Sequence, residues 1–168
     1  MILPVLLMLS AATTAAATDH KVAIEYTITV DAKDLNSFAV QMRIRNAPAT
    51  FTLAAHAHPE YDDKYWRFLE NMQVEARHFA RPDSVRWEFT GAGSDVTIRY
   101  IIRPPVEQLP RAAWRAFLTP NGGLVGGPHS FLYLIGQENA PATVTLVLPT
   151  GWIAASGMPR DAEGRFQA

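Results

Sequence analysis

The chain has 168 residues, a hydrophobic content of 48% and a formal net charge of −1. These values fit one globular domain, and the near-neutral charge with scattered basic residues excludes a nucleic-acid-binding protein. The sequence contains no cysteine, which excludes disulfides and thiol chemistry, so burial of apolar side chains must stabilise the fold.

The first 17 residues predict a secretory signal peptide. Residues 2–9 are apolar, and the small residues that follow end in an A-x-A cleavage site at residues 15–17. The positively charged start of such a signal is missing, since no Lys or Arg precedes Lys21. An uncleaved anchor is disfavoured because the apolar run covers about half of the roughly 20 residues that a spanning helix needs. We expect a mature chain from Thr18, without a membrane segment, in the periplasm or outside the cell.

Alternation of apolar and polar residues then predicts β-strands in 22–30 and 38–45, joined by a turn-rich segment. The side chains expected in the core of these two strands are Val22, Ile24, Tyr26, Ile28, Val30, Phe38, Val40, Met42 and Ile44. Further strands are predicted in residues 50–55, 84–89, 95–102, 130–135 and 143–148, and the sequence GAGSD at 91–95 predicts a hairpin turn. The fold class is therefore all-β.

The expected architecture is an antiparallel β-sandwich of about seven or eight strands, an open barrel being the alternative. One or two short helices are expected beside the sheets. The first is predicted in residues 62–74, where Tyr65, Leu69 and Met72 recur at helical spacing, and a helical turn is predicted in 111–118.

The segment HAHPEYDDKYW (56–66) is the candidate metal site. If the preceding strand continues, His56 and His58 leave the same face, and Glu60 adds a carboxylate to a zinc-like set. The alternative is that Pro59 ends the strand and the acidic residues form a solvated loop. We favour the loop, which leaves no catalytic, cofactor-binding or metal residue assigned, and His56, His58 and Glu60 remain the alternative metal ligands.

Two other patterns predict no chemistry. The glycine-rich residues 121–131 lack the Lys-Ser/Thr end of a phosphate loop, and we expect a β-turn there, with Pro128 preventing a helix. Ser130 follows His129 but is not in a Gly-x-Ser-x-Gly elbow. Among the aromatic residues, Trp87 is expected in the core and Trp66 at the surface.

A family resemblance is carried by seven segments that follow one another along the chain. They run from VAIEYTITVD near residue 22 through SVRWEF and VTIRYII to PNGGLVGGPHSFLYLIGQENAPATVTLVLPTGW and IAASGM near residue 158. Together they resemble the N-terminal β-domain of the glycyl aminopeptidase family, a group of bacterial gluzincin metallopeptidases. The resemblance implies a following thermolysin-like catalytic domain, which binds zinc through a His-Glu-x-x-His helix and a later Glu. None of the five histidines here begins such a motif, so none inherits a ligand role.

These observations predict a signal peptide at 1–17, an N-terminal β-sandwich domain at 18–160 and the start of a linker at 161–168. The expected function is that of a non-catalytic accessory domain, in a fragment or truncated form, of an exported zinc aminopeptidase. Its expected partner is the absent catalytic domain of the same polypeptide, which would hold the zinc, and this chain would hold no cofactor. The alternatives are a free-standing module that binds a peptide or glycan through Tyr61, Tyr65 and Trp66, and a small zinc hydrolase built on the alternative metal ligands.

Overall fold

The computed structural model describes residues 21–55, 65–104 and 116–168. In these ranges the chain forms twelve strands, one 3₁₀ helix and one short α-helix. The strands are β1 (Ala23–Asp31), β2 (Asp34–Arg45), β3 (Thr50–Ala55), β4 (Leu69–Val74), β5 (His78–Ala80), β6 (Arg86–Thr90), β7 (Asp95–Ile102), β8 (Phe117–Thr119), β9 (Gly122–Leu124), β10 (Leu132–Leu134), β11 (Ala142–Val147) and β12 (Phe166–Gln167). The 3₁₀ helix is η1 (Tyr65–Phe68) and the α-helix is α1 (Gly127–Ser130). The all-β prediction is confirmed.

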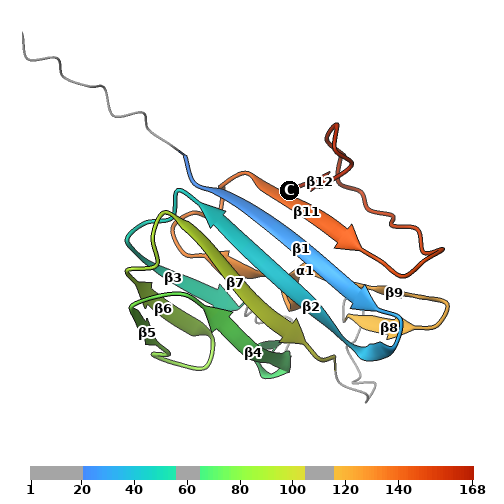
Figure 1. The fold of residues 1–168 in the computed structure, drawn as a ribbon, viewed down its shortest axis with the longest axis horizontal. Coiled ribbons are helices and arrows are strands. Elements are labelled where there is room, and N and C mark those ends of the chain that lie inside the picture. The colour runs from blue at the N-terminus through green and yellow to red at the C-terminus, as the bar shows by residue number, and fades with distance from the viewer. Residues whose placement is uncertain (1–20, 56–64, 105–115) are drawn as a thin grey trace, which may run out of the picture.

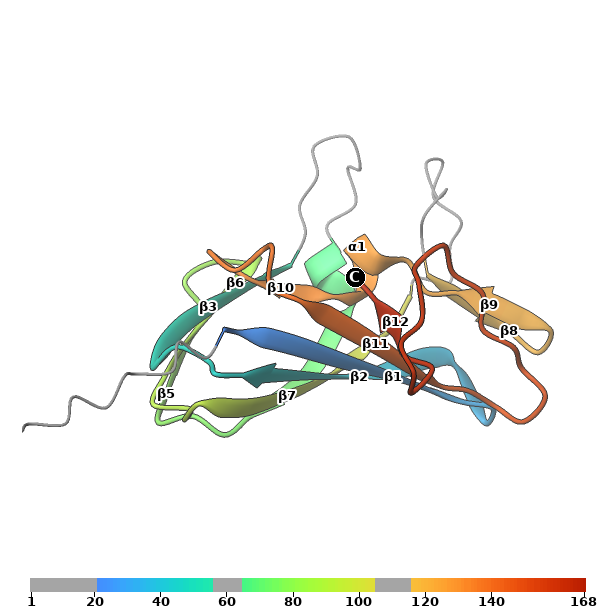
Figure 2. The same ribbon diagram turned by 90° about the horizontal axis from the view of Figure 1, so that it is seen from above.

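Two sheets face each other, and a two-stranded ribbon completes the fold (Figures 1 and 2). The larger sheet has the order β12-β11-β1-β2-β7-β4, the smaller has the order β10-β3-β6-β5, and β8 pairs with β9. Neighbouring strands are antiparallel except β1 and β11, which are parallel. Most strands beyond the seven or eight expected are short: β5, β8 and β9 have three residues each and β12 has two. β12 lies within residues 161–168, the expected start of a linker.

The core lies between the two sheets and is built by the alternation that the sequence predicts. All predicted core positions of β1 and β2 are buried except Val22, which precedes β1 and is half-buried. From the smaller sheet, Leu53, Phe89 and Leu134 pack into the same cluster. Full burial of each large apolar side chain contributes about 1.5–3 kcal/mol, so this cluster is the main source of stability.

Two buried tyrosines of the larger sheet bind the backbone of one segment across the core. The hydroxyl of Tyr26 donates to the Leu132 carbonyl oxygen at 2.7 Å. The hydroxyl of Tyr100 donates to the Ser130 carbonyl oxygen at 2.8 Å and accepts from the Leu132 backbone nitrogen at 3.2 Å. Phe131 packs on the Tyr26 ring with centroids 4.5 Å apart. These bonds attach α1 and β10 to the larger sheet.

The predicted hairpin at GAGSD is wrong. β6 belongs to the smaller sheet and β7 to the larger, so residues 91–94 cross between the sheets. This crossing runs beside the β2–β3 connection, because Gly91 N donates to Ala49 O at 3.0 Å and Ala47 N donates to Ser94 O at 2.9 Å. Gly91 and Gly93 have φ angles of 71° and 77°, which glycine adopts without strain. The glycines therefore indicate a turn, but the pairing of the flanking strands depends on distant residues.

The predicted helix at 62–74 is also wrong where the structure describes it. Residues 65–68 form η1, and the chain then becomes β4. β4 pairs with the outer edge of β7, with Leu69 opposite Ile102 and Val74 opposite Ile98. The hydrogen bonds offered by this edge, with apolar packing, outweigh the helical periodicity. The second expected helical turn lies partly outside the described residues, and its last two residues belong to β8.

The glycine-rich segment contains the expected turn, at residues 120–121 between β8 and β9, but it also contains a helix, α1. Pro128 lies in the first turn of α1, where its missing N–H needs no partner within the helix. The single turn is closed by the Phe131 backbone nitrogen, which donates to Gly127 O at 3.0 Å. Pro128 therefore starts this helix rather than preventing it.

We predict that Tyr100→Phe lowers the free energy of unfolding by about 2 kcal/mol, because two buried backbone groups lose their partner. Urea unfolding of the 168-residue chain measures the loss. Tyr133→Phe is the matched control, since Tyr133 is half-buried and its hydroxyl has no hydrogen bond among the described residues. Equal losses in the two variants would contradict the role given to the Tyr100 hydroxyl.

A pH dependence follows from the same tyrosine. Burial raises the pKa of Tyr100 above its ordinary value, whereas an unfolded tyrosine ionises near pH 10. The stability that depends on the neutral hydroxyl is complete below about pH 10 and is lost above it. The wild type should therefore lose about 1.4 kcal/mol more than Tyr100→Phe between about pH 9 and pH 11. Parallel urea titrations at the two pH values would refute this if the difference between the proteins stayed constant.

Candidate functional site

The alternative metal ligands His56, His58 and Glu60 lie outside the described residues, as does Tyr61. Within residues 21–55, 65–104 and 116–168, no group of three His, Cys, Asp or Glu side chains could hold a metal ion. The two histidines in this part are His78, exposed on β5, and His129, buried in α1. These described residues do not fit a zinc ion. In the same ranges, no helix is long and apolar enough to cross a membrane.

The His129–Ser130 pair is part of the core. Ser130 is 1% exposed, and its carbonyl oxygen accepts the hydrogen bond from Tyr100. A cavity of about 10 Å³ borders the pair and is too small for a substrate. The position of Ser130 is structural, because no reactant can reach its hydroxyl.

Neither Trp66 nor Trp87 is fully exposed in the structure. Trp87 is buried, as predicted, at 3% exposure. Trp66 was expected at the surface, but it is half-buried and packs against the core. The guanidinium of Arg81 lies 5.9 Å from the ring centre of Trp66 and 5.1 Å from that of Trp87, so one cation lies close to both rings.

Two hollows formed by the described residues are considered as candidate sites, one on each face of the larger sheet. The first, which we call the apolar groove, has a volume of about 1250 Å³. Ile28 and Leu146 of the larger sheet form its floor, Leu118 and Leu124 form one wall, and Trp152 and Ile153 form the other. Figure 2 shows that the β8–β9 ribbon and the C-terminal segment lie over the end of the sheet that the smaller sheet leaves uncovered.

The β8–β9 wall of the apolar groove depends on glycine. A Cβ atom at Gly123 would overlap the carbonyl oxygen of Phe117 and lie 3.1 Å from the Leu118 Cα. The turn is closed by the hydroxyl of Thr119, which donates to Gly122 O at 2.8 Å. Gly123 thus allows the two backbones of the β8–β9 ribbon to pack closely.

The opposite wall is fixed by the chain end. β12 pairs with β11, and the backbones of Ala142 and Ala168 exchange hydrogen bonds of 2.9 and 3.2 Å. Arg160 donates to Ala154 O at 3.0 Å, and its guanidinium lies 4.3 Å from the ring centre of Phe166. Between these anchors Ile153 is 93% exposed, so the rim of the apolar groove presents an apolar side chain to solvent.

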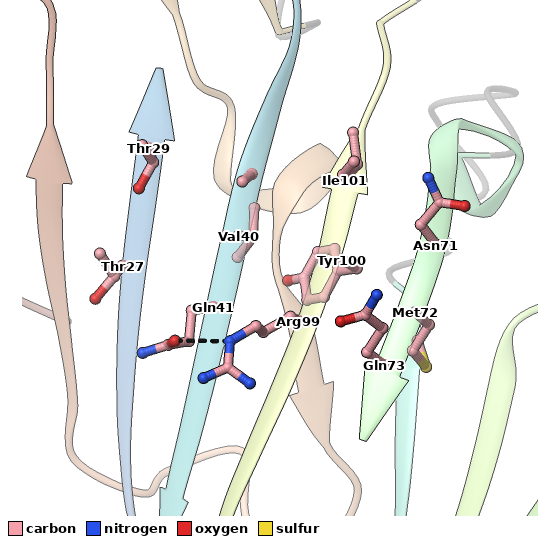
Figure 3. Close-up of a pocket in the computed structure, with 11 residues that line it drawn as sticks. Thr27, Thr29, Val40, Gln41, Asn71, Met72, Gln73, Arg99, Tyr100 and Ile101 are labelled. Carbon is pink, nitrogen blue, oxygen red and sulfur yellow. Dashed lines mark hydrogen bonds between the residues drawn. The ribbon is translucent and has the colours of Figure 1, made fainter. Parts of the chain in front are cut away.

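The second hollow, the polar hollow, lies on the outer face of the larger sheet and has a volume of about 600 Å³ (Figure 3). It is lined by Thr27 and Thr29 of β1, Gln41 of β2, Arg99 of β7, and Asn71 and Gln73 of β4. These residues of β1, β2 and β7 alternate with the core residues, so their side chains leave the opposite face. Ala39 and Ile101 add small and apolar surface to its lining.

Other charged residues on this outer face form ion pairs. Arg45 Nε lies 2.7 Å from Glu25, Arg103 Nε lies 3.2 Å from Glu70, and Arg43 binds Asp95. The hydrogen bond from Arg43 holds the pKa of the Asp95 carboxyl below its ordinary value, so this pair is charged at neutral pH. Arg99 differs, because Nε donates to a neutral partner, Gln41 Oε1, at 3.1 Å.

Sequence reasoning missed both hollows. The apolar groove combines residues from β1, β8–β9, β11 and the C-terminal segment, whose proximity no local pattern shows. A signal for the polar hollow was present in the outward positions of the predicted strands, which include Thr27, Gln41 and Arg99. The lateral order of the strands is needed to place them together.

The fold and sequence match known proteins as follows. An aminopeptidase N family protein from Idiomarina loihiensis has a similar structure, with a TM-score of 0.70 and 22% identity over 86% of this chain and 27% of that chain. An M1 zinc metallopeptidase from Deinococcus radiodurans aligns with a TM-score of 0.37 and 16% identity over 89% of this chain and 38% of that chain. The present chain thus spans about a quarter to two fifths of these proteins. No curated protein matches it.

The family model described as "Peptidase M61 N-terminal domain" matches residues 17–168. It covers the two sheets, the β8–β9 ribbon and the segment that forms β12. The resemblance seen in the order of strands and turns is thereby confirmed, and the chain belongs to the Peptidase M61 N-terminal domain family.

Proposed function

We propose that this domain is the non-catalytic N-terminal accessory domain of an exported zinc aminopeptidase. The apolar groove, with its exposed rim, is the observation that carries the proposal. A groove of about 1250 Å³ lined by aliphatic and aromatic side chains is a surface that water covers poorly. Such surfaces on a folded domain mark contacts with another protein segment.

The occupant that we propose is the zinc-binding peptidase domain of the same polypeptide. Two facts support this choice. The family is described as an N-terminal domain, and the chain covers only 27% of the length of its structural neighbour from Idiomarina. A neighbouring domain can cover Leu124 and Ile153 at the groove rim without disturbing the core. The accessory domain would then orient the peptidase domain and cover one side of it.

Zinc and the catalytic groups belong to the peptidase domain in this proposal. The described residues of the present chain offer no suitable ligand set, so no catalytic step is assigned to them. The signal peptide expected in residues 1–17 supports export, and the mature protein would act in the periplasm or outside the cell.

We predict that the purified 168-residue chain binds no stoichiometric zinc and does not hydrolyse alanyl or glycyl chromogenic amides. Elemental analysis and an aminopeptidase assay with added zinc measure the two properties. One zinc per chain that disappears in His56→Ala/His58→Ala, with or without hydrolysis, would overturn the assignment of zinc to another domain. The gene provides a second test: a stop codon directly after Ala168 would contradict a peptidase domain in the same polypeptide.

We also predict that the apolar groove of the 168-residue chain binds an environment-sensitive hydrophobic dye. Leu124→Ser/Ile153→Ser should reduce the bound-dye fluorescence by about half, because both side chains line the groove. Val147→Ser is the matched control. Val147 is 48% exposed, but its side chain lies on the outer face of the sheet, whereas its sequence neighbours Leu146 and Leu148 line the groove. Dye binding that fell equally in both variants would show that the groove is not a distinct apolar surface.

A further inference from the structure

Arg99 is the one arginine on the described outer face of the larger sheet that has no carboxylate partner. Arg43, Arg45 and Arg103 are each paired with Asp or Glu. Arg99 donates from Nε to Gln41, and neither of its terminal nitrogens has a hydrogen-bond partner in the described chain. A guanidinium in this state presents two N–H groups side by side, the geometry that binds both oxygens of a carboxylate.

The orientation of Arg99 is set by the sheet. Thr27, Gln41, Arg99 and Gln73 are successive cross-strand neighbours on β1, β2, β7 and β4. Side chains at such positions lie about 5 Å apart and contact one another. Figure 3 shows Arg99 extending from β7 across β2, where Gln41 holds its Nε. The guanidinium is therefore positioned before any ligand arrives, which reduces the entropy lost on binding.

The polar side chains around Arg99 are also available. Among the described residues, the hydroxyls of Thr27 and Thr29 and the amides of Asn71 and Gln73 make no hydrogen bonds, and Gln41 uses only its Oε1. Hydroxyl and amide groups both donate and accept hydrogen bonds, so they suit the hydroxyl groups of a ligand.

The depth of the polar hollow has a structural cause. Ala39 lies between Thr29 of β1 and Ile101 of β7, so a single methyl group separates larger neighbours. On the remaining side the pairing of β4 is interrupted between Glu70 and Gln73, and Asn71 has a φ of 53°. Such bulges redirect side chains, and they recur beside binding sites. The volume of about 600 Å³ lies within the range of small-ligand sites.

We propose that the polar hollow binds a small hydroxylated carboxylate, the chemistry of a sugar acid such as a uronic acid. Arg99 binds the carboxylate, the Thr and amide side chains bind the ligand hydroxyls, and Ala39 and Ile101 contact its C–H face. One guanidinium without a counter-charge matches a single negative charge. The ligand is either a free sugar acid or a residue of an acidic polysaccharide, since both present the same groups.

This inference is independent of the proposed function. The polar hollow and the apolar groove lie on opposite faces of the larger sheet, as the alternation along β1 requires. Loss of ligand binding by the polar hollow would leave the accessory-domain proposal intact. Zinc or peptidase activity in this chain would equally leave the ligand proposal intact.

The test is a titration of the ¹⁵N-labelled 168-residue chain, followed by NMR. Sodium galacturonate should shift the resonances of Arg99 Nε–H and the amides of Thr27, Gln41 and Gln73, with a dissociation constant on the order of 1 mM. Galactose, sodium acetate and dialanine, each lacking one part of the proposed chemistry, should bind at least about tenfold more weakly. Tetragalacturonate that binds more tightly than the monomer would identify a polysaccharide source, and equal affinity would identify the free sugar acid.

Two variants of Arg99 and one matched control separate its role from folding. Arg99→Gln should weaken galacturonate binding at least about tenfold, and Arg99→Lys should weaken it several-fold because the charge remains but the paired donors are lost. Arg86→Gln, on the outer face of the smaller sheet, should bind as the wild type does; unchanged resonances far from the substitutions confirm the fold. Any one of three results would overturn the proposal. These are wild-type affinity in Arg99→Gln, no resonance shifts at tens of millimolar galacturonate, and a comparison ligand that binds as tightly as galacturonate.

Discussion

Two buried tyrosines join the layers of the sandwich by hydrogen bonds across the core. Tyr26 and Tyr100 come from β1 and β7, on either side of β2, and both bind the backbone of residues 130–132. Apolar contacts between sheets tolerate sliding, whereas hydrogen bonds to specific backbone groups do not. These three bonds therefore fix where β10 lies, and β10 in turn pairs with β3 through Leu132–Leu134. The position of the smaller sheet over the larger follows from them.

A size difference between the layers follows from that position. β2 has twelve residues, whereas β3 has six and β10 has three, so the smaller sheet covers only part of the larger. The remaining inner face carries apolar residues such as Ile28 and Leu146, which need cover. The β8–β9 ribbon and the C-terminal segment supply it incompletely, and the apolar groove is what they leave open. The groove thus originates from the architecture of the sandwich as a whole.

The sequence predicts the strands of this fold better than their connections. In β1, β2 and β7 one face is buried. The alternation of Ile24, Tyr26 and Ile28 with polar residues is therefore enough to predict which side chains of β1 lie in the core. The sequence of β4 shows no such alternation. This strand forms because it pairs with the edge of β7, which is distant in sequence, and its pairing is interrupted at Asn71. The segment GAGSD shows why the connections were predicted less well. Glycine indicates a positive φ angle, but a hairpin turn and a crossing between sheets can both require such an angle.

Surface sites were harder to predict than the core for the same reason. Trp66 has charged neighbours in sequence, yet the fold packs it against apolar core residues, and the Arg81 guanidinium lies 5.9 Å from its ring centre. The polar hollow needs the lateral order β1-β2-β7-β4, which connects residues up to 74 positions apart, from Thr27 to Ile101. The family resemblance supplied the fold and the domain type, but it carried no information on these residues, since its motifs are strands and turns.

A single register determines both faces of the larger sheet. On β1, Ile28 floors the apolar groove while Thr27 and Thr29 line the polar hollow, and a shift by one residue would exchange them. The hydrogen bond from Tyr26 opposes that shift because it is made from the core face of the same strand. The bond that joins the layers therefore also keeps the two surfaces chemically distinct. Since the sheet separates them, a domain packed on the apolar groove would not compete with a ligand in the polar hollow.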